Sequence, residues 1–450
     1  MTLRNVSKTK IAFFLALVTG LIYWGSCGGS SSTPSLTNTA PVLDNAAPLT
    51  VGFGALGPSG GYVNGVWMTV TICVPGSTSN CQTVDNVLVD TGSIGLRVLS
   101  SALTTVPASS LGTITDSTGN QLQECVQYGD TSYTWGPVML ADVGVAGEKA
   151  ASIPIQVIGG SSAGVPSQCL AIPVNPSLPN DGNENTLETL GANGILGIGG
   201  YPWDCGTYCT SGIPSAAGYP YYVCPTGQAC SPVNVQAADQ AINPVAAVAS
   251  SDNNGVLVTL PSVPATGAAN GSIAGSLTFG IGTQSDNALA GGATVYGLDQ
   301  YGNIPQITYN GVQYTSPTNT NVLDTGSNAF SFLDATTLAS VGIVDCANAT
   351  GFYCPPSTVP FTVTFFGANS TSGTITFSIM NADTLFASGN AAFNDLGGDG
   401  GTGPSNDTLD FGLTFFFGKS VYVGMMPGLF TGESAAPSAA TSATYGYYAF

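Results

Sequence analysis

The sequence contains no histidine. This absence excludes the Ser-His-Asp triad of serine hydrolases, the Cys-His pair of cysteine peptidases and every metal site built on imidazole. If the chain is a hydrolase, carboxyl groups must move the protons that the reaction requires.

Charge is also scarce, and positive charge above all. Only 7% of the residues are charged, six of them are Lys or Arg, and the net charge is −19. Three of the six cations lie in the first ten residues, and the others are Arg97, Lys149 and Lys419. The chain therefore has no basic patch, and nucleic acid and anionic membrane surfaces are excluded as partners. The acidic balance indicates either tolerance of acid or a surface adapted for solubility.

The first 26 residues are typical of an export signal. Basic residues precede an apolar stretch, Ile11–Trp24, that is short for a membrane span. Gly25-Ser26-Cys27 follows and resembles a bacterial lipoprotein signal, with Cys27 as the lipidated residue. Ordinary signal cleavage and an uncleaved anchor are the alternatives. Residues 27–47 read as a flexible tether, so we expect a protein of the bacterial cell envelope, periplasmic or on the outer surface, that contacts the membrane only through a lipid.

The cysteines support export. There are eleven, and lipidation of Cys27 leaves an even ten, which suits disulfides in an oxidising compartment. Close spacing favours Cys73–Cys81 and Cys346–Cys354, and Cys125–Cys169 is the remaining pair outside a cluster of four. That cluster makes two further bridges or holds zinc, and export favours the bridges. Its members are Cys205, Cys209, Cys224 and Cys230.

The rest of the chain is predicted to be mostly β. From about Val51 onward, short β-branched and aromatic runs are cut by Gly, Pro, Asn and Ser. Ile307–Tyr314 is predicted to be a hairpin around an Asn-Gly turn. Helical patterns are few: Gln236–Ser250 predicts two short helices, and Asp334–Ser340 predicts one capped by Asp334.

The sequence Asp-Thr-Gly-Ser occurs twice, at Asp90–Ser93 and at Asp324–Ser327, about half the chain apart. Each copy follows an apolar run, so a buried strand should end in a tight turn that carries a carboxylate. A single copy is an ordinary turn, but two copies at this spacing predict two turns that face each other. Two carboxylates a few Å apart share one proton, and this gives one acid and one base at the same site.

Together with four further marks, the paired motif resembles the pepsin-like aspartic peptidases over nearly the whole exported chain, and within them a little-described bacterial lipoprotein group. Tyr128–Ser132 matches the flap hairpin, and Gly194–Gly197 matches the strand beneath the first turn. Ser276–Gly280 matches the strand that opens the second half, and Phe411-Gly412 with Phe415–Val423 matches its late strand and helix. The resemblance implies a mostly β, bilobal acid-protease fold with two β-barrel-like lobes and a cleft between them, at residues 48–257 and 258–450.

The resemblance also assigns roles to residues. Asp90 and Asp324 would activate water, Gly92 and Gly326 would form the turns, and Tyr128, Gly129 and Asp130 would form the flap over a polypeptide substrate. Thr91 and Thr325 would bond into the opposite lobe, and Ser93 and Ser327 would orient the carboxylates. The expected protein is an exported aspartic endopeptidase, monomeric and without metal or cofactor. The alternatives are an inactive surface protein of the same fold that binds peptide or glycan, and a structural lipoprotein without a cleft function.

Three features depart from the family pattern. Arg97 stands where many members have a tryptophan that bonds the flap tyrosine, so it either bonds Tyr128 or lies on the surface. Asp410 interrupts the second strand of the apolar-apolar-Gly type, which indicates a different construction or a shifted register. The cysteine-rich segment Tyr201–Pro232 has no clear counterpart, and we expect a stapled loop at the rim of the cleft.

Two charge patterns complete the predictions. No Lys or Arg occurs between Cys27 and Asp90, so the chain has no basic prosegment of the kind that covers an acidic cleft. The stretch Asp395–Asp410 is rich in Gly and Asp and is read as a solvated loop, with calcium binding as the alternative.

Overall fold

A computed structural model describes residues 45–60, 62–170, 182–212, 214, 218–249, 251–400, 408–428 and 433–450. The predicted signal peptide, Cys27 and nearly all of the tether lie outside these residues. Within them, no helix is both long enough and apolar enough to cross a membrane.

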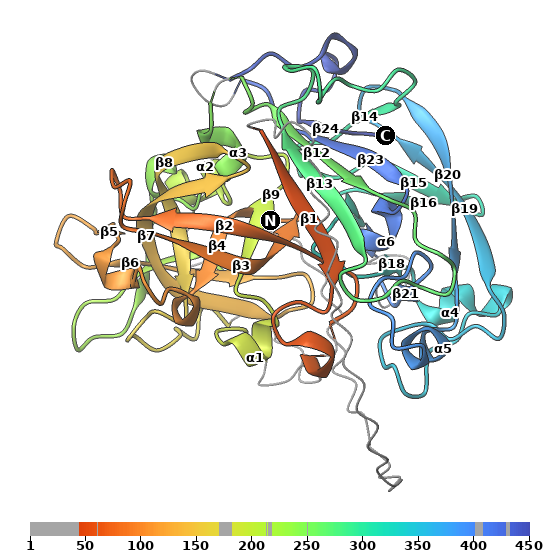
Figure 1. Ribbon diagram of the computed structural model, residues 1–450, viewed down its shortest axis with the longest axis horizontal. Helices are drawn as coiled ribbons and strands as arrows, with labels where there is room; N and C mark the ends of the chain where they lie inside the picture. Colours follow the sequence, from red (N-terminus) through yellow and green to blue (C-terminus); the bar gives the residue numbers. More distant parts are fainter. Residues whose placement is uncertain are drawn as a thin grey trace, which may run out of the picture.

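The chain folds into two β-rich lobes that lie side by side, with the strands β1 and β13 between them (Figure 1). The predicted mostly β, bilobal architecture is confirmed. Buried and exposed residues alternate along many of the strands, as expected when one face of a sheet packs on the core. In β19 the buried residues are Phe361, Val363 and Phe365, and the exposed ones that alternate with them include Pro360 and Thr362.

The N-terminal lobe is built on a closed barrel, in which six strands pair in the order β2-β3-β9-β4-β8-β7 and β7 returns to β2. Its interior is aliphatic, which suits the small space inside six strands. The strands are β2 Gly65–Cys73, β3 Cys81–Asp90, β4 Ile94–Leu99, β7 Tyr133–Val145, β8 Glu148–Ile158 and β9 Gly194–Ile198, and the short β5 Gly112–Thr113 pairs with β7.

A hairpin and the cysteine-rich segment extend this lobe outward. The strand β6 (Leu122–Gln127) pairs with β7 and forms the flap hairpin. From the cysteine-rich segment, β10 (Tyr221–Val223) and β11 (Ser231–Pro232) continue the same sheet past β6. The insert is therefore part of the flap sheet rather than a separate loop.

Six strands join the lobes in the order β1-β13-β12-β23-β24-β14. They are β1 Ala46–Gly52, β12 Gly255–Leu260, β13 Ile273–Phe279, β14 Val295–Gly297, β23 Lys419–Gly424 and β24 Tyr447–Ala449. Because β1 begins at Ala46, the end of the predicted tether is already a strand; Leu49 and Val51 are buried in it. The predicted lobe boundary after residue 257 falls inside β12, since this shared sheet belongs to both halves.

The C-terminal lobe consists of two four-stranded sheets, ordered β17-β22-β18-β21 and β16-β15-β19-β20. Its core is aromatic where that of the first lobe is aliphatic: Phe330, Phe332, Phe361, Phe377 and Phe411 contact one another through edge, tilted and stacked ring pairs. The remaining strands are β15 Gln306–Tyr309, β16 Val312–Thr315, β17 Thr320–Leu323, β18 Phe330–Phe332, β19 Val359–Phe366, β20 Ser372–Ile379, β21 Gly397–Gly398 and β22 Thr408–Phe411.

The α-helices among the described residues are short, as the sequence indicated. The predicted cap is present, because Asp334 Oδ1 accepts from the Thr337 N–H at the start of α4. Gln236–Ser250 contains one 3-10 turn and α3. The helices are α1 Leu187–Leu190, α2 Gly206–Ser211, α3 Pro244–Ala247, α4 Ala335–Leu338, α5 Ala382–Ala387 and α6 Leu413–Phe416.

The ten cysteines of the described residues form five disulfides. Three are the expected pairs Cys73–Cys81, Cys125–Cys169 and Cys346–Cys354. The four-cysteine cluster resolves into Cys205–Cys209 and Cys224–Cys230, so its thiols are not available to zinc. Each bridge closes a loop within one lobe.

Candidate active site

The two Asp-Thr-Gly-Ser motifs, here called the first turn (Asp90–Ser93) and the second turn (Asp324–Ser327), are built in the same way. The first follows β3, which pairs in parallel with β9 so that Val89 lies opposite Leu196. The second follows β17, which pairs in parallel with β22 so that Leu323 lies opposite Phe411. The second strand of the apolar-apolar-Gly type is therefore present in the expected register, and Asp410 does not disrupt it.

The two aspartate side chains are fully buried and face each other. One oxygen of each accepts from the glycine N–H of its own turn: Gly92 donates to Asp90 Oδ1 at 2.9 Å and Gly326 donates to Asp324 Oδ1 at 2.7 Å. The Gly92 N–H also lies 3.1 Å from Asp324 Oδ1, in the other lobe. The other oxygens accept from the serine hydroxyls, at 2.6 Å for Ser93 and 2.7 Å for Ser327. Both carboxyls are thus held rigidly by their own turns.

The glycines of the turns are required by the approach of the opposite carboxyl. A Cβ atom on Gly92 would lie 2.5 Å from Asp324 Cγ, and one on Gly326 would lie 2.5 Å from Asp90 Cγ. No side chain fits in either place without moving the facing aspartate.

The threonines lock the two turns together across the lobes. Thr91 Oγ1 donates to the Leu323 carbonyl at 2.9 Å, and Thr325 Oγ1 donates to the Val89 carbonyl at 2.8 Å. Each hydroxyl also accepts the backbone N–H of the other threonine, at 3.0 and 3.1 Å. Four buried hydrogen bonds with near two-fold symmetry therefore fix the spacing of the carboxyls, as the resemblance implied.

The electrostatics of the pair favour a shared proton. Burial, together with the neighbouring Asp90 and Asp410 carboxyls, raises the pKa of Asp324 well above its ordinary value. The Ser327 hydrogen bond opposes this shift. A pair arranged in this way holds one proton over a broad pH range and offers an acid and a base side by side.

Asp410 is part of this site, which sequence reasoning did not foresee. Its side chain is 2% exposed, and its Oδ2 lies 2.5 Å from Ser327 Oγ. The prediction of a solvated loop at Asp395–Asp410 is wrong for both of its ends, because Asp395 is also buried, while Asp407 lies outside the described residues. The alternation of β22 places Asp410 on the face opposite to the core residues Leu409 and Phe411, next to the second turn.

The flap hairpin is present, but its tyrosine is turned inward. The Tyr128 N–H donates to the Ser132 carbonyl across the turn, and Asp130 Oδ1 accepts from the Ser132 N–H and hydroxyl. The Tyr128 ring is only 4% exposed and packs in a buried cluster that includes Tyr62 and Trp67. Its hydroxyl lies 3.2 Å from Thr134 Oγ1. The predicted contact of Tyr128 with substrate therefore requires the hairpin to move.

Tyr62, which the sequence did not single out, reaches from this cluster to the other lobe. Its hydroxyl donates to the carbonyl of Gly326, in the second turn, at 3.3 Å. The nearby Asn64 amide donates to the Asn328 and Phe393 carbonyls. The segment that leads into β2 thus holds the N-terminal lobe against the second turn.

Arg97 is buried and does not lie on the surface. Its guanidinium donates to Glu124 Oε1 at 2.9 Å and to Asp204 Oδ2 at 3.3 Å. Burial would lower the pKa of Arg97, but Glu124, Tyr128 and Asp204 together raise it. Burial and Glu124 raise the pKa of Asp204, while Arg97 and the Tyr221 hydroxyl oppose that shift. One cation therefore ties the flap strand β6 and the cysteine-rich segment to β4, which follows the first turn.

A cavity of about 410 Å³ opens beside the first turn. The cysteine-rich segment lines one side of it and the C-terminal lobe the other, so this segment does lie at the rim of the site. Six aromatic side chains line the cavity, and its wall contains no Lys or Arg. Its residues include Thr91, Gly92, Ile94, Tyr201, Trp203, Asp204, Tyr208, Tyr301, Val322, Tyr445 and Tyr448.

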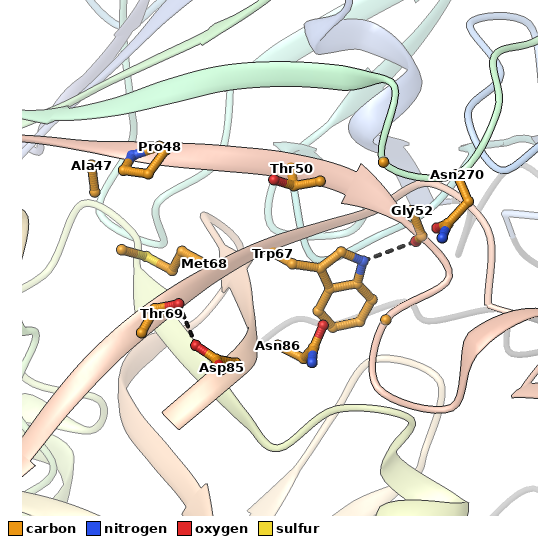
Figure 2. Close-up of a pocket in the computed structure, with 12 residues that line it drawn as sticks. Ala47, Pro48, Thr50, Gly52, Trp67, Met68, Thr69, Asp85, Asn86 and Asn270 are labelled. Atoms are coloured by element: carbon orange, nitrogen blue, oxygen red, sulfur yellow. Dashed lines mark hydrogen bonds between the residues drawn. The ribbon is translucent and has the colours of Figure 1, made fainter. Parts of the chain in front are cut away.

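A second cavity, of about 360 Å³, lies on the outer face of β1 and β2 (Figure 2). Trp67 forms part of its wall and donates to the Gly52 carbonyl, and Thr69 donates to Asp85 at its edge. None of its lining residues belongs to either turn. Within the described residues one group of potential metal ligands gathers, Cys346, Cys354 and Asp383, but its two sulfurs form a disulfide.

Comparison with known proteins gives three findings. The solved structures similar to this chain include the crystal structure of an aspartic proteinase from Irpex lacteus, with 16% identity and a TM-score of 0.47 over 90% of this chain and 96% of that one. No curated protein matches the sequence. Residues 41–445 match the family described as "Protein of unknown function (DUF3443)", and because the match spans most of the sequence, the chain belongs to that family.

Proposed function

We propose that the protein is an aspartic endopeptidase that hydrolyses peptide bonds with the Asp90–Asp324 pair. One observation carries the proposal: two identical turns from distant parts of the chain bring two buried carboxyls together, and each glycine leaves room only for the opposite carboxyl. An arrangement with a purely structural role has no need of two facing carboxyls, because burying them opposes folding.

The mechanism follows from one shared proton. The ionised carboxyl accepts a proton from a water molecule between the lobes, and the protonated carboxyl donates to the oxygen of the scissile carbonyl. The water oxygen attacks the carbonyl carbon, and a tetrahedral intermediate forms. The proton taken from water then passes to the leaving amine nitrogen as the C–N bond breaks. At the same time a hydroxyl of the intermediate returns its proton to the other carboxylate as the product carboxylic acid forms, so the pair is singly protonated again.

Substrate must reach carboxyls that are fully buried. The flap hairpin, with Tyr128 and Tyr62 behind it, is the part that we expect to open, because hairpin motions of this kind gate many active sites. The aromatic cavity beside the first turn then receives a side chain of the polypeptide. Because its wall holds no cation, we expect it to favour apolar and aromatic side chains over acidic ones.

We also propose that the protein is exported and anchored by lipid at Cys27. The five disulfides support an oxidising compartment. The second candidate function, a protein that binds peptide or glycan without cleaving it, is favoured by two observations, the inward position of Tyr128 and the burial of both carboxyls.

The test is hydrolysis of a denatured protein mixture by the purified chain from acidic to neutral pH, with and without pepstatin. We expect cleavage favoured by acid that pepstatin blocks and that Asp90→Asn and Asp324→Asn each reduce by about 10³-fold or more. Asp395→Asn, which removes a buried carboxyl elsewhere in the C-terminal lobe, is the matched control and should keep its activity. A folded protein that cleaves nothing at any pH but retains denatured peptide would support the binding function instead.

A further inference from the structure

One hydroxyl group lies between two carboxyls in the second turn. Ser327 Oγ is 2.7 Å from Asp324 Oδ2 and 2.5 Å from Asp410 Oδ2, so the two carboxyl oxygens are at most about 5 Å apart. A hydroxyl has a single hydrogen to donate. If Asp324 and Asp410 were both ionised, one of these short contacts would join two acceptors without a hydrogen between them. At least one of these two carboxyls therefore carries a proton.

The surroundings of Asp410 favour the neutral form of that carboxyl. The side chain is buried, and its Oδ1 has no hydrogen-bond partner among the described residues. An ionised carboxyl in such a place loses its hydration without compensation, whereas a neutral one can donate its hydrogen to Ser327. Burial accordingly raises the pKa of Asp410 well above its ordinary value; the Ser327 hydrogen bond opposes this shift and Asp90 adds to it.

Other groups around Asp410 do not supply a counter-charge. Its neighbours in the sheet are Val322 on β17 and Ser331 on β18, both uncharged. On β24, burial together with Asp324 and Asp410 raises the pKa of Tyr448, which keeps that phenol neutral. In the described part of the chain the cations are Arg97, Lys149 and Lys419, and none of them contributes to the pKa shift of Asp410.

We propose that Asp410 is a positioning residue of the site, a third carboxyl joined to the pair through Ser327, which keeps the pair singly protonated to higher pH than two carboxyls could alone. The inference rests on the proposed function and extends it to the pH range of the enzyme. When Asp410 is protonated, its hydrogen goes to Ser327 Oγ and the Ser327 hydrogen goes to Asp324.

When Asp90, Asp324 and Asp410 together lose one proton, the Asp90–Asp324 pair stays singly protonated, which is the state that hydrolysis requires. The proton that leaves for solvent comes from Asp410, and the Ser327 hydrogen then turns to Asp410. The remaining charges sit on Asp410 and on the pair; because Asp410 acts on Asp324 less strongly than Asp90 does, this arrangement costs less than two charges within the pair. The new charge also disfavours ionisation of Asp324, so the pair keeps its proton.

The decisive measurement is the pH profile of kcat/KM for the full chain, for Asp410→Asn and for Asp410→Ile. Asparagine keeps the shape and a donor to Ser327 but cannot ionise, and isoleucine copies Ile195, the residue in the equivalent register of β9. We expect the alkaline limb of the profile to move to lower pH by about one to two units in both variants, the size expected for a charge roughly 5 Å away. Asp395→Asn should leave the limb in place.

An alkaline limb that stays in place in Asp410→Asn, or that moves equally in Asp395→Asn, would overturn the proposal. A second readout separates its failure from failure of the proposed function. In protein labelled with ¹³C at the aspartate carboxyls, the Asp324 signal should titrate at lower pH in Asp410→Asn than in the unchanged chain. If no variant hydrolyses peptide yet this shift is seen, the peptidase is refuted and the coupling stands; if the signal does not move, the coupling itself is refuted.

Discussion

The two turns share their hydrogen bonds but differ one strand away. In the first lobe, Arg97 on β4 lies opposite Ile195 on β9; at the equivalent places of the second lobe, Ser331 on β18 lies opposite Asp410 on β22. Each lobe therefore buries one ionisable side chain at this level of the sheet, on different strands and of opposite charge.

The two lobes deal with that buried charge in different ways. The first surrounds its cation with Glu124 and Asp204, so the guanidinium remains charged and becomes a structural junction. The second gives its carboxyl only a serine that already serves Asp324, so the carboxyl retains a proton. The comparison shows that the two symmetric turns fix the distance between the Asp90 and Asp324 carboxyls. The residues that differ have separate effects: Arg97 stabilises the first lobe, and Asp410 controls protonation in the second.

The symmetric part is tested by Gly92→Ala and Gly326→Ala. In each variant the new methyl group would meet the facing aspartate, so we expect both to lower kcat/KM by about 10²-fold or more, because small displacements of reacting groups are costly. The two losses should be similar. Gly291→Ala, at an exposed glycine where φ is not positive and a Cβ has open space, controls for the loss of a glycine as such. Activity retained in only one of the two turn variants would show that the turns are not equivalent.

The asymmetric part is tested by Arg97→Met, which leaves Glu124 and Asp204 buried without their cation. We expect a loss of about 3–5 kcal/mol in the free energy of unfolding, measured with denaturant at neutral pH. Ser331→Ala, at the equivalent place in the second lobe, should cost less than about 1 kcal/mol.

A second variant shows whether the loss comes from unpaired charge. Adding Glu124→Gln and Asp204→Asn to Arg97→Met should restore much of the stability, since no buried charge is then left unpaired. If the triple variant is no more stable than Arg97→Met, lost packing and not charge explains the effect.

The smallest effect concerns stability against pH. In the second lobe, burial raises the pKa of Asp395 to about 6, so the folded chain keeps a proton that the unfolded chain loses near its ordinary value of 3.8. The contribution of Asp395 to the free energy of unfolding is therefore fully present below pH 4 and is lost as the pH rises through 6. Asp395→Asn should remove about 1–2 kcal/mol of the loss between pH 4 and pH 7, after allowance for screening by solvent.

The first lobe supplies the contrast. Although burial opposes it, Lys149 and the Ser152 and Gly76 N–H groups lower the pKa of Asp142, so its contribution is present above pH 4 and fades in acid. Lys149→Met should therefore cost about 0.5–1 kcal/mol at neutral pH and almost nothing in strong acid. The two substitutions should change the dependence of the free energy of unfolding on pH in different ways. The same change in both variants would contradict a raised pKa for Asp395 and a lowered pKa for Asp142.

Much of the fold and the pair at its centre could be predicted from the sequence, because local rules decide them. A buried strand that ends in Asp-Thr-Gly specifies its own turn, and cysteines close in sequence had few possible partners. The role of Asp410 could not be predicted, because it depends on the pairing of β22 with β17, two segments separated by most of the second lobe. Arg97 could not be placed either, since Glu124 and Asp204 come from distant segments and carry no sequence signal that links them.

The shared sheet also bears on how the protein avoids aggregation. A chain in which 43% of the residues are hydrophobic is prone to associate, and its net charge of −19 opposes contact between copies. Its long sheet also ends in strands of only two and three residues, β11 and β14, and Pro232 in β11 has no N–H to offer. Short edges of this kind give a second copy almost nothing to pair with, so the sheet resists growth into aggregates at the places where sheets usually begin to grow.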